Sequence, residues 1–497
     1  MKLGIIAREA GFALPDGVDG GAEGDVTGFA IDHRKVAPGT VFGAFAGARF
    51  NGEDFIADAV AAGAVAVVAR PEATVRGAVH IADAEPRRAF ARLAARFFTP
   101  VPETVVAVTG TNGKTSTVEM TRQLWRMAGY SAASIGTLGV TTADESVSTG
   151  LTTPDIVTFL SNMTGLAREG VTHVAYEASS HGLSQYRNEG LRVVAGAFTN
   201  LSRDHLDYHA TMDDYFAAKM RLFDDVVADD GTAVIWADDE AWSGKAVAHA
   251  AARGLNLLTV GAKGEGIRLL SRTPTQLGQT LEIEHGAEGQ RRARKVNLPL
   301  IGAYQAANAL VAAGLVLATG GDADRTFEAL GRLQPVRGRL ERAAISRAGA
   351  PVYVDYAHTP DAIEAAIAAL RPHVKGRLIT VFGAGGDRDG GKRPEMGRAA
   401  CAGSDLVIVT DDNPRGEDPA DIRKAVLAGC TAGAREIGDR RAAIAAAIAE
   451  ATGDDIVLVA GKGHEQGQIV GRGDAARVLP FDDVQVAREC AGPAGGT

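Results

Sequence analysis

The segment VVAVTGTNGKTS at residues 105–116 combines the residue types that bind the phosphates of a nucleotide. Its β-branched residues favour a buried strand, and the glycines that follow let backbone N–H groups close around phosphate oxygens. A helix beginning near Lys114 would bring its ammonium to the outer phosphates, with Thr115 or Ser116 on magnesium. Only two residues separate the glycines, so the general G-x-x-x-x-G-K-[ST] motif is not matched. The predicted ATP-binding residues here are Gly110, Thr111, Asn112, Gly113, Lys114, Thr115 and Ser116.

Acidic and histidine side chains follow the next two predicted strands. Glu177 comes directly after an apolar run at residues 173–176, where its carboxylate could bind a magnesium ion that bridges phosphates. A helix-capping role for Glu177 and the serines after it is the alternative interpretation. The next run leads into TNLSRDHLDYH at residues 199–209, and this crowding of titratable groups is costly without a ligand or metal. We assign a direct role there to His205.

The composition excludes several classes of partner. The chain has 497 residues, of which 46% are apolar and 23% charged, as in globular proteins with more than one core. A net charge of −9 without a long basic run argues against a nucleic-acid partner. Three scattered cysteines fit a reducing compartment, and no apolar stretch approaches the roughly 20 residues of a membrane helix. We expect a cytoplasmic protein with small anionic ligands and no membrane partner.

Strand and helix patterns predict three α/β domains. Residues 1–100 carry short strand-like runs that end at a proline-rich break, which indicates a small N-terminal α/β domain. Residues 101–334 alternate apolar runs with helical segments, as in a central P-loop-type ATPase domain with a parallel sheet. Residues 335–497 repeat this pattern as a C-terminal Rossmann-like α/β domain. Ligands bind at the carboxyl ends of parallel strands, so the loops there should hold the functional residues.

Short motifs rich in glycine, acidic and hydroxyl residues follow one another along the chain. The first are TGTNGKTS, TTPD, EASSHGL and TNLSRDHLDYH. Further on are DYAHTPD at residues 355–361, GGDRDGGKRPEMG at 385–397, DDNPR at 411–415 and GKGHE at 461–465. Together they resemble the Mur ligase family, cytoplasmic enzymes that build the peptide of bacterial cell-wall precursors. The resemblance implies an ATP-dependent, ADP-forming ligase that requires Mg²⁺ and works through an acyl phosphate.

The resemblance changes the interpretation of Lys219. This residue lies on a predicted amphipathic helix at residues 215–223, and periodicity alone predicts a surface or snorkelling side chain. In similar enzymes the matching lysine is carbamylated, and this N6-carboxylysine can bind or orient the metal. The implied catalytic residues are Lys114, Glu177, His205 and Lys219, and the implied metal-binding residues are Thr115, Ser116, Glu177, His205 and Lys219. Further implied nucleotide-binding residues are Asn308, Arg339, Asp355 and His358.

A UDP-linked muramyl dipeptide, UDP-N-acetylmuramoyl-L-alanyl-D-glutamate, is the implied substrate. Hydroxyl, amide and guanidinium groups suit its diphosphate and carboxylate oxygens. The positions that match the family's substrate contacts are Asp32, Arg34, Thr152, Thr153, Ser179, Gln185 and Arg187. The chain departs from the family pattern at His33, Trp236 and Arg337, which replace commoner serine, asparagine and proline residues.

The loop around Arg415 predicts which amino acid is added. A guanidinium forms a planar fork suited to a carboxylate, and meso-2,6-diaminopimelate differs from lysine by a distal carboxylate. Lysine would leave Arg415 unpaired, so discrimination against lysine can be large. A turn leading into a helix is the alternative interpretation of this loop. The implied acceptor site comprises Arg388, Asp412, Asn413, Pro414, Arg415, Gly461 and Glu465.

We expect ATP to phosphorylate the D-glutamyl γ-carboxylate, after which the diaminopimelate amine attacks the acyl phosphate. Three alternatives stand beside this function. Arg415 disfavours a lysine-adding Mur ligase, and the TTPD and EASSHGLSQYR segments disfavour a folylpolyglutamate-type ligase. A P-loop ATPase without ligase activity would leave the DNPR and GKGHE loops without a purpose.

Overall fold

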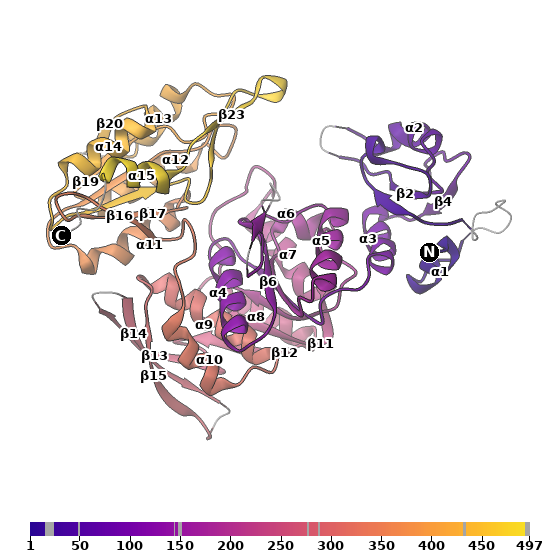
Figure 1. Cartoon of the computed structure of the whole chain (residues 1–497), viewed down its shortest axis with the longest axis horizontal. Coiled ribbons are helices and arrows are strands. Elements are labelled where there is room, and N and C mark those ends of the chain that lie inside the picture. The colour runs from indigo at the N-terminus through magenta and orange to yellow at the C-terminus, as the bar shows by residue number, and fades with distance from the viewer. Residues whose placement is uncertain are drawn as a thin grey trace.

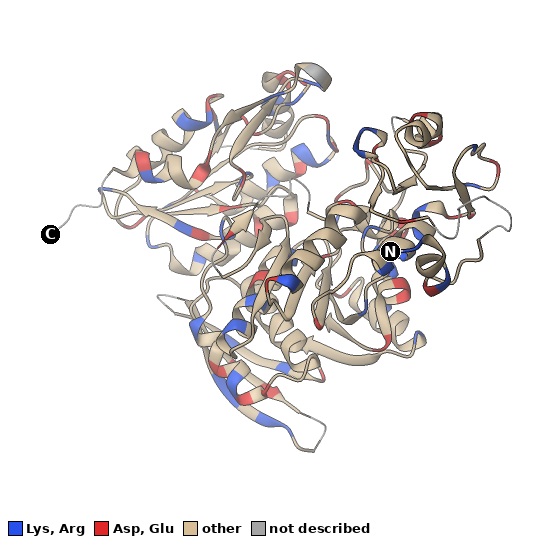
Figure 2. Cartoon of the chain, turned by 45° about the vertical axis from the view of Figure 1, so that its right-hand side comes forward, with Lys and Arg blue, Asp and Glu red and all other residues tan. Residues whose placement is uncertain are grey.

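The computed structural model describes residues 1–14, 24–47, 50–143, 145–147, 152–275, 278–286, 289–430 and 434–492. Three α/β units follow one another in chain order, and Figure 1 shows the first and third at opposite sides of the second. Acidic and basic residues are interspersed along the backbone of all three units (Figure 2). None of the described helices is long and apolar enough to cross a membrane. The three-domain α/β fold class predicted from the sequence is confirmed.

The N-terminal unit is a parallel sheet in the order β1-β2-β3-β4. Its strands are β1 (Gly28–Ala30), β2 (Thr40–Gly43), β3 (Ala66–Ala69) and β4 (Val79–Ala82). Its helices are α1 (Leu3–Glu9), α2 (Ile56–Ala61) and α3 (Pro86–Phe97). Helix α3 begins with a proline, whose missing N–H has no partner in a first turn, and buries Phe90 and Leu93 in the core.

The central unit has a sheet in the order β15-β14-β13-β12-β11-β10-β5-β9-β6-β7-β8. The strands from β13 to β6 in this order pair in parallel, as predicted, whereas β13–β15 and β6–β8 pair antiparallel at the two edges. The strands at these edges are joined by short connections, which can link only antiparallel neighbours. The strands are β5 (Thr104–Thr109), β6 (Ala132–Gly136), β7 (Gly139–Thr141), β8 (Ser146–Val147), β9 (His173–Glu177), β10 (Val193–Phe198), β11 (Val227–Trp236), β12 (Asn256–Gly261), β13 (Ile267–Thr275), β14 (Gly278–His285) and β15 (Arg292–Leu298).

Helices cover both faces of the central sheet. They are α4 (Lys114–Met127), α5 (Ile156–Arg168), α6 (Ser180–Ser184), α7 (Met212–Arg221), α8 (Ser243–Ala252), α9 (Ala303–Ala318) and α10 (Ala323–Ala329). Apolar residues of α4, α9 and α10 share one hydrophobic core, and those of α5, α7 and α8 share another. The second core also includes α3 of the N-terminal unit, so this helix packs as part of both units.

The C-terminal unit has a sheet in the order β16-β17-β21-β18-β19-β20, parallel except for its edge strand β16. Its strands are β16 (Glu341–Ile345), β17 (Pro351–Asp355), β18 (Leu378–Phe382), β19 (Leu406–Val409), β20 (Ala434–Glu436) and β21 (Ile456–Ala460), and a separate hairpin is formed by β22 (Gly467–Val470) and β23 (Arg477–Pro480). Its helices are α11 (Pro360–Leu370), α12 (Lys392–Gly403), α13 (Pro419–Leu427), α14 (Arg440–Glu450) and α15 (Asp483–Ala491).

The strand order brings distant motifs to the same sheet edges. In the central unit β5 lies between β10 and β9, and the register pairs Val108 with Glu177 and Thr109 with Phe198. The phosphate loop, the EASSHGL segment and the TNLSRDHLDYH segment therefore leave the sheet side by side. In the C-terminal unit the loops after β17, β18, β19 and β21 leave their sheet together in the same way.

Candidate active site

The phosphate loop predicted from the sequence connects β5 to α4. Gly113 is the N-cap of α4 and has a φ of 89°, a left-handed conformation that favours glycine. A Cβ atom on Gly110 would lie 1.9 Å from the hydroxyl oxygen of Thr199, so only glycine fits against the end of β10. The backbone N–H of Asn112 donates to the side chain of Asn200 at 2.9 Å. The loop is thus held at the amino end of a 14-residue helix, an arrangement that binds phosphate.

Two lysine ammonium groups share one carbonyl oxygen of this loop. Lys114 Nζ donates to the Gly110 carbonyl at 2.9 Å, and Lys219 Nζ from α7 donates to the same oxygen at 2.8 Å. Lys219 is 1% exposed, so the surface or snorkelling position predicted from periodicity is wrong. The reason is that α7 turns this side of the helix inward, where the Tyr215 ring centre lies 4.3 Å from Lys219 Nζ. Burial lowers the pKa of both lysines, and the charge of Lys114 further lowers the pKa of Lys219.

Glu177 ends β9 and is buried, with 2% of its surface exposed. Its carboxylate accepts hydrogen bonds from the backbone N–H of Thr137 at 2.7 Å and from the Thr137 hydroxyl at 3.1 Å. The N-cap of α6 is Ser179, whose hydroxyl accepts a hydrogen bond from the N–H of Gly182 at 3.0 Å. Glu177 therefore does not cap this helix. Its negative charge favours the ammonium form of Lys114 and so opposes the lowering of the Lys114 pKa by burial.

Arg339 joins the phosphate-loop helix to the C-terminal unit. Its Nη2 donates to the Thr115 hydroxyl at 3.0 Å, and its Nη1 lies 3.2 Å from Nδ1 of His464. Its guanidinium carbon lies 4.5 Å from the centre of the Tyr356 ring. Burial, reinforced by the charge of Arg339, lowers the pKa of His464 to about 3. The neutral imidazole can therefore accept a hydrogen bond from the guanidinium.

Three further residues predicted to bind the nucleotide are buried close to this junction. Ser116 is 2% exposed on α4, and a Cβ atom on Gly113 would lie 2.3 Å from Oδ1 of Asn308 on α9. Asp355 ends β17 and accepts hydrogen bonds from the N–H of Leu340 at 2.6 Å and from the Tyr304 hydroxyl at 3.2 Å. Burial raises the pKa of Asp355.

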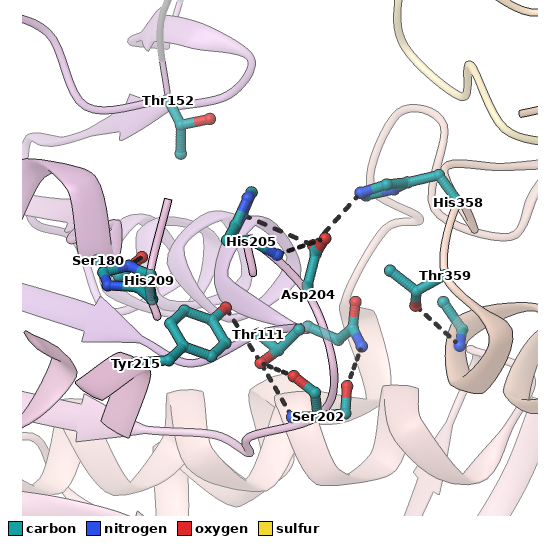
Figure 3. A network of polar contacts seen from close by, with 12 residues as sticks. Thr111, Thr152, Ser180, Ser202, Asp204, His205, His209, Tyr215, His358 and Thr359 are labelled. Atoms are coloured by element: carbon teal, nitrogen blue, oxygen red, sulfur yellow. Dashed lines mark hydrogen bonds and ion pairs between the residues drawn. The ribbon is translucent and has the colours of Figure 1, made fainter. Parts of the chain in front are cut away.

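Asp204 is the centre of a charged cluster that joins the central and C-terminal units (Figure 3). Its carboxylate lies 3.6 Å from Nε2 of His205, 3.8 Å from Nε2 of His358 and 3.4 Å from Nζ of Lys392 on α12. Burial opposes ionisation, but the nearby His358, His205 and Lys392 lower the pKa of Asp204 well below its usual value. Burial also lowers the pKa of His205 to about 3. The cluster brings together two predicted residues, His205 and His358.

A cleft of about 1520 Å³ lies between the central and C-terminal units. The predicted residues that line it are Thr152, Thr153, Ser179, Arg187, His205, His358, Arg388, Asp412, Asn413, Arg415, Gly461 and Glu465. Among the described lining residues there is no member of the phosphate loop. Residues from the EASSHGL, DYAHTPD, DNPR and GKGHE motifs thus meet around a single cavity, although they lie far apart in the sequence.

The residues predicted for the peptide arm of the substrate form a hydrogen-bonded group on the central side of the cleft. Arg187 donates to the carbonyl of Thr153 at 2.9 Å and to the side chain of Gln185 at 2.8 Å. The Thr153 hydroxyl donates to the carbonyl of Glu177 at 2.8 Å. The hydroxyl oxygens of Thr152 and Thr137 lie 3.2 Å apart, within hydrogen-bonding distance. These contacts connect the cleft wall directly to the buried Glu177.

The residues predicted for the acceptor lie on the opposite side of the cleft. Arg415 has a φ of 51°, and its Nη1 donates to the carbonyl of Gly386 at 2.9 Å. Arg415 and Arg388 both line the cleft, and burial, reinforced by the charge of Arg388, lowers the pKa of Arg415. The carbonyl oxygen of Pro414 lies so close to Gly386 that a Cβ atom there would clash with it. Gly461 has a φ of 118° and packs against the Asp412 carboxylate.

Asp32 and Arg34 lie in the N-terminal unit and are not among the described residues that line the cleft. Arg34 donates to the Asp32 carboxylate at 2.8 Å, which is the main reason that the pKa of Asp32 falls to about 2. Between them, His33 stacks on the Phe55 ring with centres 4.3 Å apart. The structure therefore does not bring these two predicted residues together with the other substrate residues.

Sequence analysis missed Asp204, Thr137, Lys392 and Lys462 as residues of this site. Asp204 and Lys392 stand inside motifs that were recognised, and their titratable side chains were the available signal. Their roles depend on contacts between units, which no local pattern reveals. Thr137 carries no comparable signal because its importance comes from its position beside Glu177.

The fold and the site define a nucleotide-binding α/β enzyme in which two units share one cleft. Three domain models of one family match the chain in order. They are described as "Mur ligase family, catalytic domain" at residues 25–98, "Mur ligase middle domain" at 108–316, and "Mur ligase, glutamate ligase domain" at 338–463. The chain belongs to the Mur ligase family, whose members are ATP-dependent ligases that form amide bonds. Membership implies ATP and Mg²⁺.

Two relatives that match almost the whole chain carry the same name. A protein of Zymomonas mobilis, UDP-N-acetylmuramoyl-L-alanyl-D-glutamate--2,6-diaminopimelate ligase, is 61% identical over 98% of both chains. One of the same name from Bradyrhizobium diazoefficiens is 53% identical over 92% of this chain and 93% of its own. A solved structure of that name has a TM-score of 0.70 at 31% identity, covering 99% of both chains. A folylpolyglutamate synthase of Mycobacterium tuberculosis has a TM-score of 0.62 at 20% identity, covering 76% of this chain and 92% of its own, and so shares the fold.

Proposed function

We propose that the protein adds meso-2,6-diaminopimelate to the D-glutamyl γ-carboxylate of UDP-N-acetylmuramoyl-L-alanyl-D-glutamate, with ATP converted to ADP and phosphate. The observation that carries the proposal is the guanidinium of Arg415, which lines the same cleft as His205 and His358. Relatives up to 61% identical bear the name of this ligase. The reaction belongs to the synthesis of peptidoglycan precursors, and we assign it to the cytoplasm, where ATP and the UDP-linked substrate are present.

We assign residues 1–100 to binding the UDP-muramyl substrate, residues 101–334 to ATP and residues 335–497 to the amino acid. In this assignment the phosphate loop binds the phosphates of ATP through its N–H groups and Lys114. The other nucleotide contacts come from Asn308, Arg339, Asp355 and His358, which lie close to the junction of the second and third parts. The UDP end is assigned to Asp32 and Arg34, and the peptide arm to Thr152, Thr153, Ser179, Gln185 and Arg187.

The residues around the loop fit a magnesium ion. Mg²⁺ prefers oxygen ligands, and the buried Glu177 carboxylate, the Thr115 or Ser116 hydroxyl and a carbamylated Lys219 would supply them, with His205 contacting a second ion. When bound, Mg²⁺ neutralises phosphate charge and stabilises the phosphoryl group during transfer. Lys114 adds a fixed positive charge at the same place, so the γ-carboxylate can attack the terminal phosphoryl group of ATP with less repulsion.

Lys219 is suited to carbamylation. A neutral amine attacks CO₂, and the product is a carbamate and a proton. Burial and the charge of Lys114 both lower the pKa of Lys219, which increases the neutral fraction near pH 7. The resulting anion would lie beside the ammonium of Lys114 and replace a repulsive pair of cations by an attractive pair.

Amide formation takes place on the acyl phosphate. The γ-carboxylate becomes a good electrophile once phosphorylated, and the diaminopimelate amine attacks its carbonyl carbon. A tetrahedral intermediate forms, phosphate leaves with the bonding electrons, and the amine loses a proton. Arg415 and Arg388 would bind the distal carboxylate, and Glu465 and Asp412 the distal ammonium, which orients the second amine toward the central side of the cleft.

A competition assay tests the proposal. Purified protein is given the UDP-dipeptide, ATP, and equal amounts of meso-diaminopimelate and L-lysine, and the products are analysed by mass spectrometry. We expect the diaminopimelate-containing tripeptide as the main product. A lysine-containing product in excess would identify a lysine-adding ligase, and ATP hydrolysis without any peptide product would identify an ATPase.

A further inference from the structure

Lys462 is a fully buried cation in the wall of the acceptor site. Its side chain has 0% exposure, and it belongs to the GKGHE loop after β21. Its Nζ donates to Oδ1 of Asn413 at 2.7 Å and to the carbonyl of Gly467 at 2.8 Å. It also lies 3.4 Å from Oε2 of Glu465 and 3.7 Å from Oδ1 of Asp412. Burying an ammonium is costly, so the surrounding acceptors must be arranged around it.

The same cation completes a ring of contacts that fixes Glu465. The Asn413 side chain donates to Oε2 of Glu465 at 2.9 Å, while its own Oδ1 accepts from Lys462. Asn413 Oδ1 also accepts a hydrogen bond from the N–H of Ile469 in β22 at 2.9 Å. Asn413 Nδ2 and Lys462 Nζ therefore approach the same oxygen of Glu465, Oε2, at 2.9 and 3.4 Å. Within the described chain, Oε1 of Glu465 has no protein partner, and Glu465 lines the cleft.

We propose that Lys462 is a positioning residue that makes the acceptor site selective for one configuration at the distal carbon of the bound amino acid. The inference rests on the proposed function, because it concerns the same diamino dicarboxylic acid. Lys462 and Asn413 hold Oε2 of Glu465, so that Oε1 points to one place in the cleft. That oxygen receives the distal ammonium, while Arg415 receives the distal carboxylate.

A site distinguishes the two configurations of a carbon atom only when the substituents of that carbon meet partners held in fixed positions. Arg415 is fixed by its bond to the Gly386 carbonyl and by the backbone contact of its N–H to the Ile469 carbonyl at 3.0 Å. A free glutamate has several rotamers and could follow an ammonium to either side of the carbon. With Glu465 fixed, the LL isomer of diaminopimelate cannot satisfy both partners when the carbon chain points toward the acyl phosphate. A misplaced ammonium leaves a buried charge unpaired, which is strongly unfavourable.

The test compares kcat/KM for meso- and LL-diaminopimelate in the full-length wild-type protein and in Lys462→Met, which keeps the length of the side chain and removes its charge. We expect the wild type to prefer the meso isomer and Lys462→Met to lower the meso-to-LL ratio by about tenfold or more. The loss should appear mainly in KM for the amino acid, because ATP and the UDP-dipeptide bind elsewhere.

Glu465→Gln and the double variant supply the second measurement. If Lys462 acts through Glu465, Glu465→Gln alone lowers the ratio comparably and the double variant lowers it no further. Glu465→Gln also keeps the proposal testable if Lys462→Met does not fold. A proportional loss with both isomers, leaving the ratio unchanged in the folded variants, overturns the positioning role. A wild type that fails to ligate meso-diaminopimelate at all contradicts the proposed function instead.

Discussion

Lys114 and Lys219 donate hydrogen bonds to the same carbonyl oxygen, that of Gly110, at 2.9 and 2.8 Å. Two ammonium groups this close repel each other, and burial increases the repulsion because water no longer screens it. The pKa of Lys219 is lowered by burial and then by Lys114. The pair therefore supports the proposal that Lys219, rather than an exposed lysine, reacts with CO₂.

Lys219→Ala should lower kcat by about 100-fold or more, because an anion beside the transferring phosphoryl group is lost. Short carboxylic acids such as formate should restore part of the activity by occupying the vacated position. The measurement is ADP release with and without added acid. Lys424→Ala, which removes an exposed lysine on α13, serves as the control. Wild-type activity in Lys219→Ala before any addition would exclude the carbamate role.

Arg415→Ala should change the choice of amino acid. We expect kcat/KM for meso-diaminopimelate to fall by about 100-fold, because its carboxylate loses a charge-assisted bidentate partner in a partly buried site. The value for L-lysine should change by less than about threefold, since lysine has no group to pair with this guanidinium. Steady-state kinetics with each amino acid measures both values. An unchanged ratio between the two would remove Arg415 as the selector.

Asp204→Asn should weaken the link between the two sides of the cleft. The variant keeps the shape of the side chain but loses its ion pairs with Lys392 and His358. We expect kcat/KM for both ATP and the amino acid to fall by about tenfold or more, because the buried Lys392 loses its ion-pair partner. Asp213→Asn, at an exposed aspartate on α7, is the control. Equal activity in the two variants would contradict a role for the Asp204 cluster.

Much of the fold could be predicted because local patterns specify it. The β-branched run before the glycines predicts β5, and the helix predicted to begin near Lys114 is α4, which begins at that residue. The loops at the carboxyl ends of strands could be assigned to function for the general reason that ligands bind there. The residues lining the cleft confirm that these loops meet.

Contacts between distant segments could not be predicted in the same way. Asp204 and Lys392 are 188 residues apart, and their pairing depends on how two sheets face each other. The burial of Lys219 depends on how α7 packs on the phosphate loop, whereas periodicity describes only one helix in isolation. Arg337 likewise pairs with Asp482 at 2.6 Å, which gives this departure from the family pattern a structural contact. Nothing in the structure explains Trp236.

His464 should make the free energy of unfolding depend on pH. Burial lowers its folded-state pKa to about 3, below the ordinary value of 6.5. The unfolded chain therefore binds more protons between these two values, and stability falls as the pH drops from 6.5 toward 3. Between pH 7 and 5.5 the free energy of unfolding should fall by about 1 kcal/mol less in His464→Gln than in the wild type. Urea unfolding at both pH values measures this difference, and an unchanged difference in the variant would refute it.

The central claim is that ATP is consumed to activate a muramyl-linked carboxylate for attack by an amine. Its most direct test follows ADP release and the amount of UDP-muramyl tripeptide in the same reaction over time, with the UDP-dipeptide, ATP and meso-diaminopimelate present. We predict one ADP for each tripeptide. When the amino acid is omitted, we predict no appreciable ADP release beyond a single turnover. Continuous ADP release without tripeptide would contradict the account.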